Sequence, residues 1–136
     1  MPAHRHIDAE SSGGSACTAA SVRPTHKIRT FEERVDPGGG GINVARVVRV
    51  LGGDALALIM TGGVTGRLVE ELLDEAGVRW QALPIRGRTR ISVTVHDRQS
   101  SLEYRFVPEG PNVEQDDNDP EIKAKASDLV FLKLAL

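Results

Sequence analysis

The most regular pattern of apolar positions begins just after a run of four glycines. From Asn43 onward, apolar side chains recur at positions i, i+3, i+4 and i+7, which predicts an amphipathic helix. Asn43 is a residue type that caps helix N-termini and Gly52 is a type that ends helices, so both ends are signalled. The predicted buried stripe consists of Val44, Val47, Val48 and Leu51.

A second helix is predicted between two short apolar runs. We expect Thr65 to cap it and Gly77 to end it. Residues 55–61 (ALALIMT) and 78–85 (VRWQALPI) flank it and are predicted as strands, the first apolar throughout, as in strands buried on both faces. This strand–helix–strand order predicts a parallel sheet with helices on its faces. The predicted buried stripe of this helix consists of Leu68, Leu72, Leu73 and Ala76.

Strict alternation of apolar and polar residues replaces the helical pattern at residues 89–97. Residues 102–107 repeat the alternation after a short break, so the two segments are expected to form an antiparallel hairpin. Strands with one polar face suit an exposed antiparallel sheet, which we interpret as a flap. Residues 26–35 are expected to be a further extended segment. The apolar face comprises Ile91, Val93 and Val95, and the polar face Arg90, Ser92 and Thr94.

The remaining segments show weaker patterns. Residues 1–22 are small and polar without periodicity, so we expect a disordered tail ahead of a folded region at 23–136. Residues 114–121 (EQDDNDPE) are predicted to form an acidic loop, and residues 128–136 begin like a buried strand.

Composition and charge exclude several classes of protein. Hydrophobic residues make up 40% of the 136 residues, charged residues 26% and aromatic residues only 4%, so aliphatic side chains must fill a globular core. The formal charge of −2 offers no general attraction to nucleic acid or acidic lipid, and no apolar run approaches the roughly 20 residues of a membrane span. Cys17 is the single cysteine and the N-terminus lacks a signal-peptide core, so we expect a cytosolic protein without nucleic-acid or membrane partners.

The glycine run at residues 38–41 carries the strongest chemical signal. Backbone without Cβ atoms lets a ligand approach N–H groups, and the helix that follows presents unpaired N–H groups and the positive end of its dipole. These features favour a polar, hydroxyl-rich or anionic ligand, with Asn43 at the rim. A plain turn with an N-cap is the alternative. Neither the P-loop pattern nor the G-x-G-x-x-G spacing is present.

Three basic residues are candidates for binding an anion. Lys27 lies just upstream of the glycines, and Arg90 and Arg105 lie on the predicted hairpin. Planar guanidinium groups suit bidentate recognition of phosphate. Periodicity alone favours a solvated strand face for the two arginines, with a phosphate clamp as the alternative.

Two clusters of metal-ligand residue types are interpreted as solvated segments. One alternates along the tail, where nothing rigid holds a coordination geometry, and the other lies in the acidic loop. We therefore expect no metal site. The two clusters are His4, His6 and Asp8, and Asp116, Asp117 and Asp119.

The stretch from Gly38 to Gly62 resembles the N-terminal signature of the PfkB (ribokinase-like) carbohydrate kinases. In GGGGINVARVVRVLGG, followed by nine residues and Gly62, Asn43, Ala45 and Gly52 are in register with that signature. RPTHKIR, GGVTG, LLDEAGV, TRISVTV and EYRFVPEGP extend the likeness in the same order, over about residues 23–112. The chain looks closest to the branch that includes minor 6-phosphofructokinase, 1-phosphofructokinase and tagatose-6-phosphate kinase.

The resemblance implies part of a ribokinase-like three-layer α/β sandwich with a small antiparallel β lid. The lid strands would be about residues 26–35, 89–97 and 102–107. In this family the lid closes over the sugar and takes part in dimerisation, so the resemblance also implies a homodimer formed through the lid.

The activity implied by the resemblance is phosphorylation of a sugar phosphate, such as fructose 6-phosphate, by MgATP. Carried over by position, Gly38, Gly39 and Asn43 would contact the sugar hydroxyls. The phosphate that the substrate already carries would be held by Lys27, Arg90 and Arg105.

Three departures from the family limit what the resemblance implies. The family begins with an apolar strand and an Asp that binds the sugar, whereas Gly14 stands at the position of that Asp, so the first strand and one ligand are expected to be missing. No Ser-Gly-Ser type turn follows the strand predicted at 128–132. The C-terminal half, with the Gly-Ala-Gly-Asp segment that supplies the general base and with most of the ATP site, is absent.

We therefore expect no catalytic residue in these 136 residues. The chain alone should neither bind MgATP nor act as a kinase, and an abrupt divergence at both ends suggests a truncated or frameshifted reading frame. The alternatives are a non-catalytic binder of sugar phosphates and a fragment that dimerises through its lid.

Overall fold

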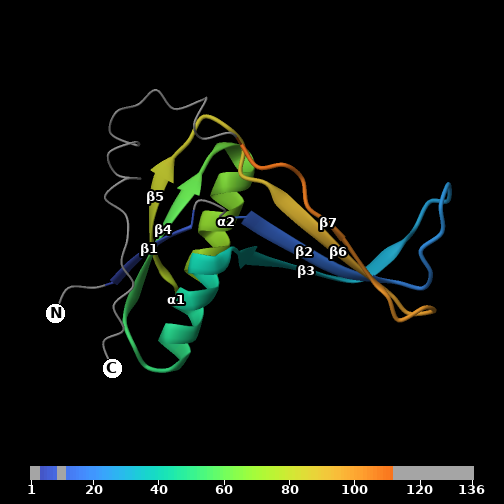
Figure 1. Ribbon diagram of the computed structural model, residues 1–136, viewed down its shortest axis with the longest axis horizontal. Helices are drawn as coiled ribbons and strands as arrows, with labels where there is room; N and C mark the ends of the chain where they lie inside the picture. The colour runs from blue at the N-terminus through green and yellow to red at the C-terminus, as the bar shows by residue number, and fades with distance from the viewer. Residues whose placement is uncertain (1–3, 9–11, 112–136) are drawn as a thin grey trace.

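Three parallel strands form the core sheet of the computed structural model, which describes residues 4–8 and 12–111. They are β1 (His4–Asp8), β4 (Ala55–Thr61) and β5 (Arg79–Pro84), in the order β1-β4-β5 (Figure 1). β4 is the middle strand, and its last five residues are buried, as its continuous apolar sequence predicts. The predicted parallel sheet is confirmed.

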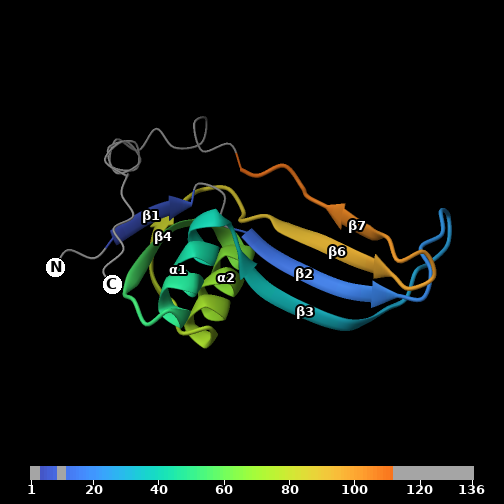
Figure 2. The same ribbon diagram turned by 60° about the horizontal axis from the view of Figure 1, so that its bottom comes forward.

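Two helices connect these strands and cover one face of the sheet. α1 (Gly40–Val50) leads into β4, and α2 (Gly63–Glu75) connects β4 to β5 (Figure 2). Successive right-handed crossovers in one direction across a parallel sheet place both helices on the same side. The core between helices and sheet is aliphatic and includes Ile42, Ile59 and Leu73, each with no exposed surface.

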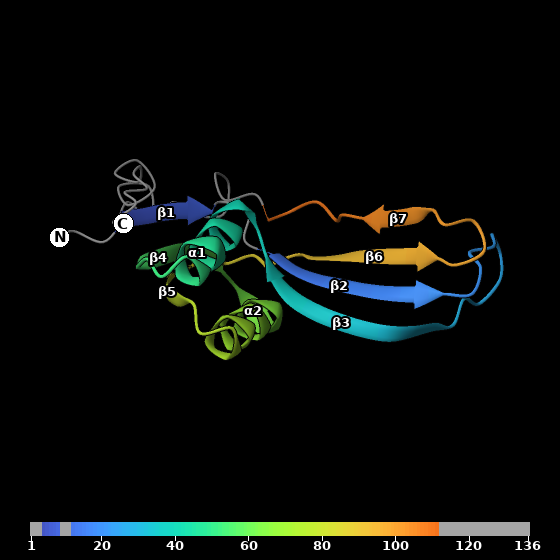
Figure 3. The same ribbon diagram turned by 90° about the horizontal axis from the view of Figure 1, so that it is seen from below.

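A four-stranded sheet projects from this core as a lid (Figures 1 and 3). Its strands are β2 (Ser12–Ala19), β3 (Thr30–Gly38), β6 (Ile91–Asp97) and β7 (Glu103–Phe106), in the order β3-β2-β6-β7. The predicted hairpin is confirmed, because β6 and β7 pair antiparallel. The lid is a mixed sheet rather than purely antiparallel, since β2 and β6 leave the core in the same direction and pair parallel.

The prediction of a disordered tail at residues 1–22 is wrong for the described part of that stretch. β1 pairs with β4 in the core sheet, so the first strand that we expected to be missing is present. β2 lies inside the lid, with ladders to both β3 and β6. Its sequence, SGGSACTA, has low strand propensity, and its small residues admit close neighbours: the Cβ position of Gly13 lies 3.3 Å from the Ile91 side chain.

The helices lie where the periodicity predicts, but their starts and the buried face of α1 differ. α1 begins at Gly40 with Gly39 as N-cap, and α2 begins at Gly63 with Gly62 as N-cap, so the predicted caps Asn43 and Thr65 lie inside the helices. In α1 the same i, i+3, i+4, i+7 spacing fits two faces, because the helix carries apolar residues on both. The buried face is Gly41, Ile42, Ala45 and Val48, while Val47 and Leu51 of the predicted stripe are 57% and 69% exposed.

In α2 the predicted stripe is partly correct. Leu73 is fully buried, but Val69 takes the buried position that we assigned to Leu68, which is 36% exposed. The predicted acidic loop at 114–121 and the strand predicted at 128–136 lie outside the described residues. Within the described residues, no helix is both long and apolar enough to cross a membrane.

Candidate functional site

The glycine run forms the junction between lid and core. β3 ends at Gly38, and Gly39 adopts a φ of 125°, which favours glycine, so that the chain turns directly into α1. The N–H of Asn43 donates to the Gly39 carbonyl over 3.0 Å, which closes the first helical turn. Among residues 4–8 and 12–111, no side chain forms a capping hydrogen bond at this helix N-terminus. The turn therefore places the half-buried backbone of Gly38 and Gly39 at the start of the helix, where the lid begins.

Arg90 and Arg105 lie on the same face of the lid. Arg105 is opposite Thr94 in the β6–β7 ladder, and Thr94 follows Arg90 by four residues in an extended segment. This polar face also carries Asp36, which pairs across β2 and β3 with Gly14. Arg90 is half-buried near Gly110, and exposed Arg105 donates to Glu103 over 3.0 Å. The structure thus brings the two predicted arginines to one face.

Lys27 lies at the other end of the lid. It is exposed in the loop between Ala19, which pairs with Asp97 at the end of β6, and the start of β3 at Thr30. Arg90 precedes the opposite end of β6, whose seven residues span about 23 Å at about 3.3 Å per residue. Within one chain, Lys27 and Arg90 therefore do not meet at one phosphate.

Asp97 fixes the loop that carries Lys27. Its carboxylate is buried and accepts N–H groups from Val22 at 3.0 Å, Gln99 at 2.8 Å and Ser100 at 3.2 Å. These bonds, with that from Val22 first, hold the pKa of Asp97 below its ordinary value, although burial opposes the shift. One carboxylate thus ties the β2–β3 loop to the β6–β7 turn at the tip of the lid.

The segment before β6 is fastened to the core through Thr89, which the sequence did not single out. Its hydroxyl accepts the Gly62 N–H at 3.0 Å, its own N–H donates to the Gly62 carbonyl at 3.0 Å, and its carbonyl accepts the Thr65 hydroxyl at 2.6 Å. Thr89 is 3% exposed. Two sequence features could have pointed to this anchor: the glycines after a buried strand and a threonine next to a candidate arginine. Because Gly62 and Thr89 are 27 residues apart, the sequence did not show that they meet.

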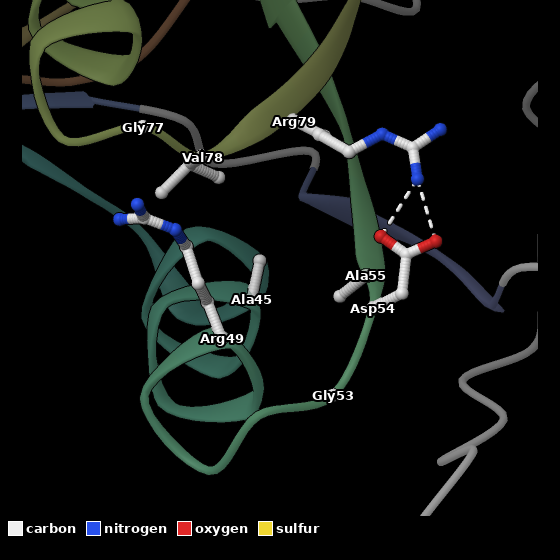
Figure 4. A pocket seen from close by; sticks show the side chains of 8 residues that line it. All are labelled: Ala45, Arg49, Gly53, Asp54, Ala55, Gly77, Val78 and Arg79. Atoms are coloured by element: carbon white, nitrogen blue, oxygen red, sulfur yellow. Dashed lines mark hydrogen bonds and ion pairs between the residues drawn. The ribbon is translucent and has the colours of Figure 1, made fainter.

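Three hollows in the described surface differ in their position relative to the predicted arginines, and the first lies beside Thr94 and Glu103, the ladder partner and hydrogen-bond partner of Arg105. One of about 300 Å³ on the polar lid face is lined by Thr18, Arg34, Thr94 and His96 among others. Another of about 450 Å³, lined by Asn43 and Arg46, follows the outer side of α1. A third of about 190 Å³ lies at the amino ends of β4 and β5, beside the Arg79–Asp54 ion pair (Figure 4). The third hollow therefore lies at the end of α1 and of the core sheet that is opposite the glycine turn.

Metal-ligand residue types do not gather in the part of the chain that the structure describes. Within it, no group of three or more His, Cys, Asp or Glu side chains is placed to hold a metal ion. The side chains of His4, His6 and Asp8 and the acidic cluster at 116–119 lie outside what is described. Cys17 is buried in β2, and its thiol lies 3.7 Å from the Thr94 carbonyl oxygen.

The chain is similar in sequence to known carbohydrate kinases. The pfkB family carbohydrate kinase model matches residues 14–133. The ATP-dependent 6-phosphofructokinase isozyme 2 of Mycobacterium tuberculosis is 46% identical over 114 residues, covering 82% of this chain and 34% of that protein. The isozyme 2 enzyme of Escherichia coli is 37% identical over 103 residues, covering 76% and 33%. The chain thus spans about a third of the length of these curated relatives.

Solved structures agree with this similarity. The phosphofructokinase-2 of Escherichia coli in complex with fructose-6-phosphate aligns with a TM-score of 0.81 at 31% identity, over 93% of this chain and 41% of that one. A possible 1-phosphofructokinase of Thermotoga maritima has the same fold, with a TM-score of 0.73 at 20% identity, over 90% and 40%. The described residues therefore have a partial ribokinase-like α/β fold with its β lid.

Proposed function

We propose that this chain, which belongs to the PfkB family of carbohydrate kinases, binds a phosphorylated hexose of the fructose 6-phosphate kind. The main support for this proposal is that Arg90 and Arg105 share the polar face of the lid, which joins α1 at the glycine turn. The relatives support the ligand class, since two are 6-phosphofructokinases and a similar structure contains fructose-6-phosphate.

In this proposal the two ends of the ligand meet different chemistry. Gly38 and Gly39 bring bare backbone to the sugar hydroxyls at the N-terminus of α1, where the helix dipole favours oxygen ligands. Asn43 lies one turn further along the exposed side of α1 and reaches the same ligand from the helix. Arg90 and Arg105 supply planar, permanently charged forks that suit the phosphate oxygens.

The chemical step is not assigned to this chain. Phosphoryl transfer needs a base that takes the proton of the attacking hydroxyl and donors that stabilise the phosphoryl group in flight. The 136 residues contain neither a Gly-Ala-Gly-Asp segment nor a P-loop. We therefore propose that this chain alone, in the cytosol as expected from its sequence, neither binds MgATP nor turns over substrate.

Calorimetric titration with fructose 6-phosphate tests the binding. A charge-assisted contact contributes about 1.5–3 kcal/mol, so Arg90→Ala should weaken binding roughly 10- to 100-fold. Arg79→Ala is the matched control, because it removes the same charge from an exposed ion pair at the opposite edge of the sheet and should leave the Kd unchanged. The parent chain giving no heat of binding, or both variants weakening it equally, would overturn the proposal.

A coupled assay with ATP and fructose 6-phosphate tests the absence of turnover by the chain alone. No product should form above the level of a blank. Turnover by the parent chain that disappears in Lys27→Ala or Arg90→Ala would show that the chain is itself a kinase.

A second candidate function, dimerisation through the lid, follows from the separation of Lys27 and Arg90. For both to hold one phosphate, they must come from two copies. The lid face opposite the arginines is apolar and open: Phe106, which pairs with Val93, is 59% exposed, and Val95 and Tyr104 beside them are half-buried. A second copy laid against this face would cover it. The tetrameric form solved for phosphofructokinase-2 of Escherichia coli shows that one relative forms oligomers.

Mixing two variants that are each deficient in binding fructose 6-phosphate tests this arrangement. Lys27→Ala and Arg90→Ala chains should each bind fructose 6-phosphate poorly, whereas random pairing after mixing should restore about a quarter of the sites. Phe106→Asp should convert the dimer to monomer in sedimentation. Val50→Glu, which places a charge on the exposed side of α1, should not. A parent chain that sediments as a monomer at high concentration would refute the dimer.

A further inference from the structure

Arg90 lies between two backbone anchors. The carbonyl of Thr89 and the N–H of Arg90 belong to one planar peptide unit, and that carbonyl accepts the Thr65 hydroxyl at 2.6 Å. The carbonyl of Arg90 belongs to the next planar unit, and it accepts the N–H of Gly13, the second residue of β2, at 3.1 Å. Both peptide planes that flank the Arg90 Cα are therefore held, one by the core and one by the lid.

The core anchor requires an unusually close approach of two loops. A Cβ on Gly62 would lie 1.9 Å from the Gly87 carbonyl oxygen, and a Cβ on Gly66 would lie 3.2 Å from the Thr89 hydroxyl oxygen. These two glycines let the 85–89 segment settle against the first turn of α2. Thr89 then exchanges two hydrogen bonds with Gly62, one through its side chain and one through its backbone.

The hydroxyl groups of Thr89 and Thr65 form hydrogen bonds that an apolar side chain of the same shape could not form. A valine has nearly the shape of threonine and would fill the buried position of Thr89, but it offers no acceptor for the Gly62 N–H. Thr65 sits in the first turn of α2, yet its hydroxyl bonds to residue 89 across 24 positions instead of capping its own helix. Both hydroxyl groups thus act on the backbone that carries Arg90.

We propose that Thr65 and Thr89 are positioning residues that fix the direction in which Arg90 presents its guanidinium to the substrate's phosphate. This inference rests on the proposed function, in which Arg90 holds that phosphate. A guanidinium directed by a fixed backbone loses less freedom on binding than one on a mobile loop, so the two hydroxyl groups raise affinity without touching the ligand.

The first test measures fructose 6-phosphate binding by calorimetry, well below the melting temperature of each variant. Thr65→Val and Thr89→Val should each raise the Kd about five- to tenfold, and Thr65→Ser and Thr89→Ser should recover most of the loss. In an Arg90→Ala background the same valine substitutions should have no further effect, because they act through Arg90. The Thr65 variants keep the test decisive if Thr89→Val does not fold.

Thr61→Val is the matched control. Thr61 is as buried as Thr89, and its hydroxyl bonds to Glu70 at 2.5 Å, but this bond does not reach either peptide plane beside Arg90. Thr61→Val should lower the melting temperature while leaving the Kd unchanged. Equal weakening of binding by Thr61→Val and Thr65→Val, or weakening that persists in the Arg90→Ala background, would reduce the hydroxyl groups to a purely structural role and overturn the inference.

A second measurement separates this inference from the proposed function. In the unliganded chain, the heteronuclear NOE of the Arg90 backbone amide should fall in Thr65→Val and stay at the parent value in Thr61→Val. An unchanged Arg90 amide overturns the positioning role whether or not the chain binds a sugar phosphate. A parent chain that binds no sugar phosphate, but whose Arg90 amide loosens as expected, refutes the proposed function alone and leaves the anchoring of Arg90 supported.

Discussion

Replacing Gly62 by alanine should separate the two loops that meet beneath the lid. An alanine Cβ at this position would lie 1.9 Å from the Gly87 carbonyl oxygen, 2.6 Å from that of Ile85 and 2.9 Å from the Ile85 Cγ1. The φ of Gly62 is −154°, extended backbone that alanine adopts without strain, so the cost is one of space alone. Two of the three colliding atoms belong to the backbone and cannot turn aside as a side chain would.

The size of the effect follows from the displacement needed. To reach the about 3.3 Å of a normal contact between carbon and a carbonyl oxygen, the Gly87 oxygen must move by about 1.4 Å. Such a shift strains the paired bonds between Gly62 and Thr89 and the Ile85 N–H bond to the Thr61 carbonyl. Overpacking of 1–3 kcal/mol, together with weakened hydrogen bonds of about 1 kcal/mol each, predicts a loss of about 3 kcal/mol in the free energy of unfolding.

Urea unfolding followed by circular dichroism measures this loss, and a thermal melt should shift down by about 10 °C. Gly40→Ala is the control, because a Cβ there meets nothing within 4 Å at the first position of α1. Alanine at that helical position should leave the free energy of unfolding equal or raise it by up to about 0.5 kcal/mol. A Gly62→Ala chain that unfolds at the urea concentration of the parent, with the same slope, would show that the loops are not packed as described.

Three further perturbations probe the lid and the surface. Stability conferred by the lowered pKa of Asp97 is present above the ordinary pKa of about 4 and is lost as the pH falls through the lower folded value, so Asp97→Asn should flatten the fall in melting temperature as the pH is lowered from about 4; a profile identical to that of the parent would contradict the role of the Val22 bond. Gly14→Asp should tighten fructose 6-phosphate binding by roughly tenfold in calorimetry, because the resemblance places a sugar-binding Asp there and a Cβ meets only the Asp36 carbonyl oxygen, at 3.6 Å; weaker binding would show that repulsion from Asp36 dominates. Val50→Glu should increase the soluble yield on expression without lowering the melting temperature, since Val50 is 86% exposed; an unchanged soluble yield would show that the exposed Val50 side chain does not limit solubility.

Elements whose signal is local were predictable from the sequence. The ends of both helices are marked by glycines, and Gly52 and Gly77 adopt the positive φ that ends helices. The hairpin of β6 and β7 follows from period-2 alternation on both sides of a short break. The glycine turn at 38–39 was recognisable because its signal is local: consecutive glycines stand directly before the apolar pattern of a helix.

Elements defined by distant partners were not predictable in this way. β2 has a glycine- and serine-rich sequence that favours disorder by itself, and it becomes a strand because β3 and β6 pair with it on both sides. Alternation places Arg90 on a polar face, but it does not reveal that Lys27 lies at the far end of the lid. That separation depends on how β2 and β3 pair.

By itself, the sequence determined the family, the order of strands and helices from β3 to β7, and the position of the glycine turn, because each depends on residues close together in the chain. Only the tertiary structure decided which of the two apolar sides of α1 is buried, since the same periodicity fits Ile42 and Ala45 as well as Val47 and Leu51. It also decided that Thr65 bonds to Thr89 instead of capping α2. Periodicity specifies which residues share a face of one element, whereas the partner that covers the face is brought by chain folding from tens of residues away.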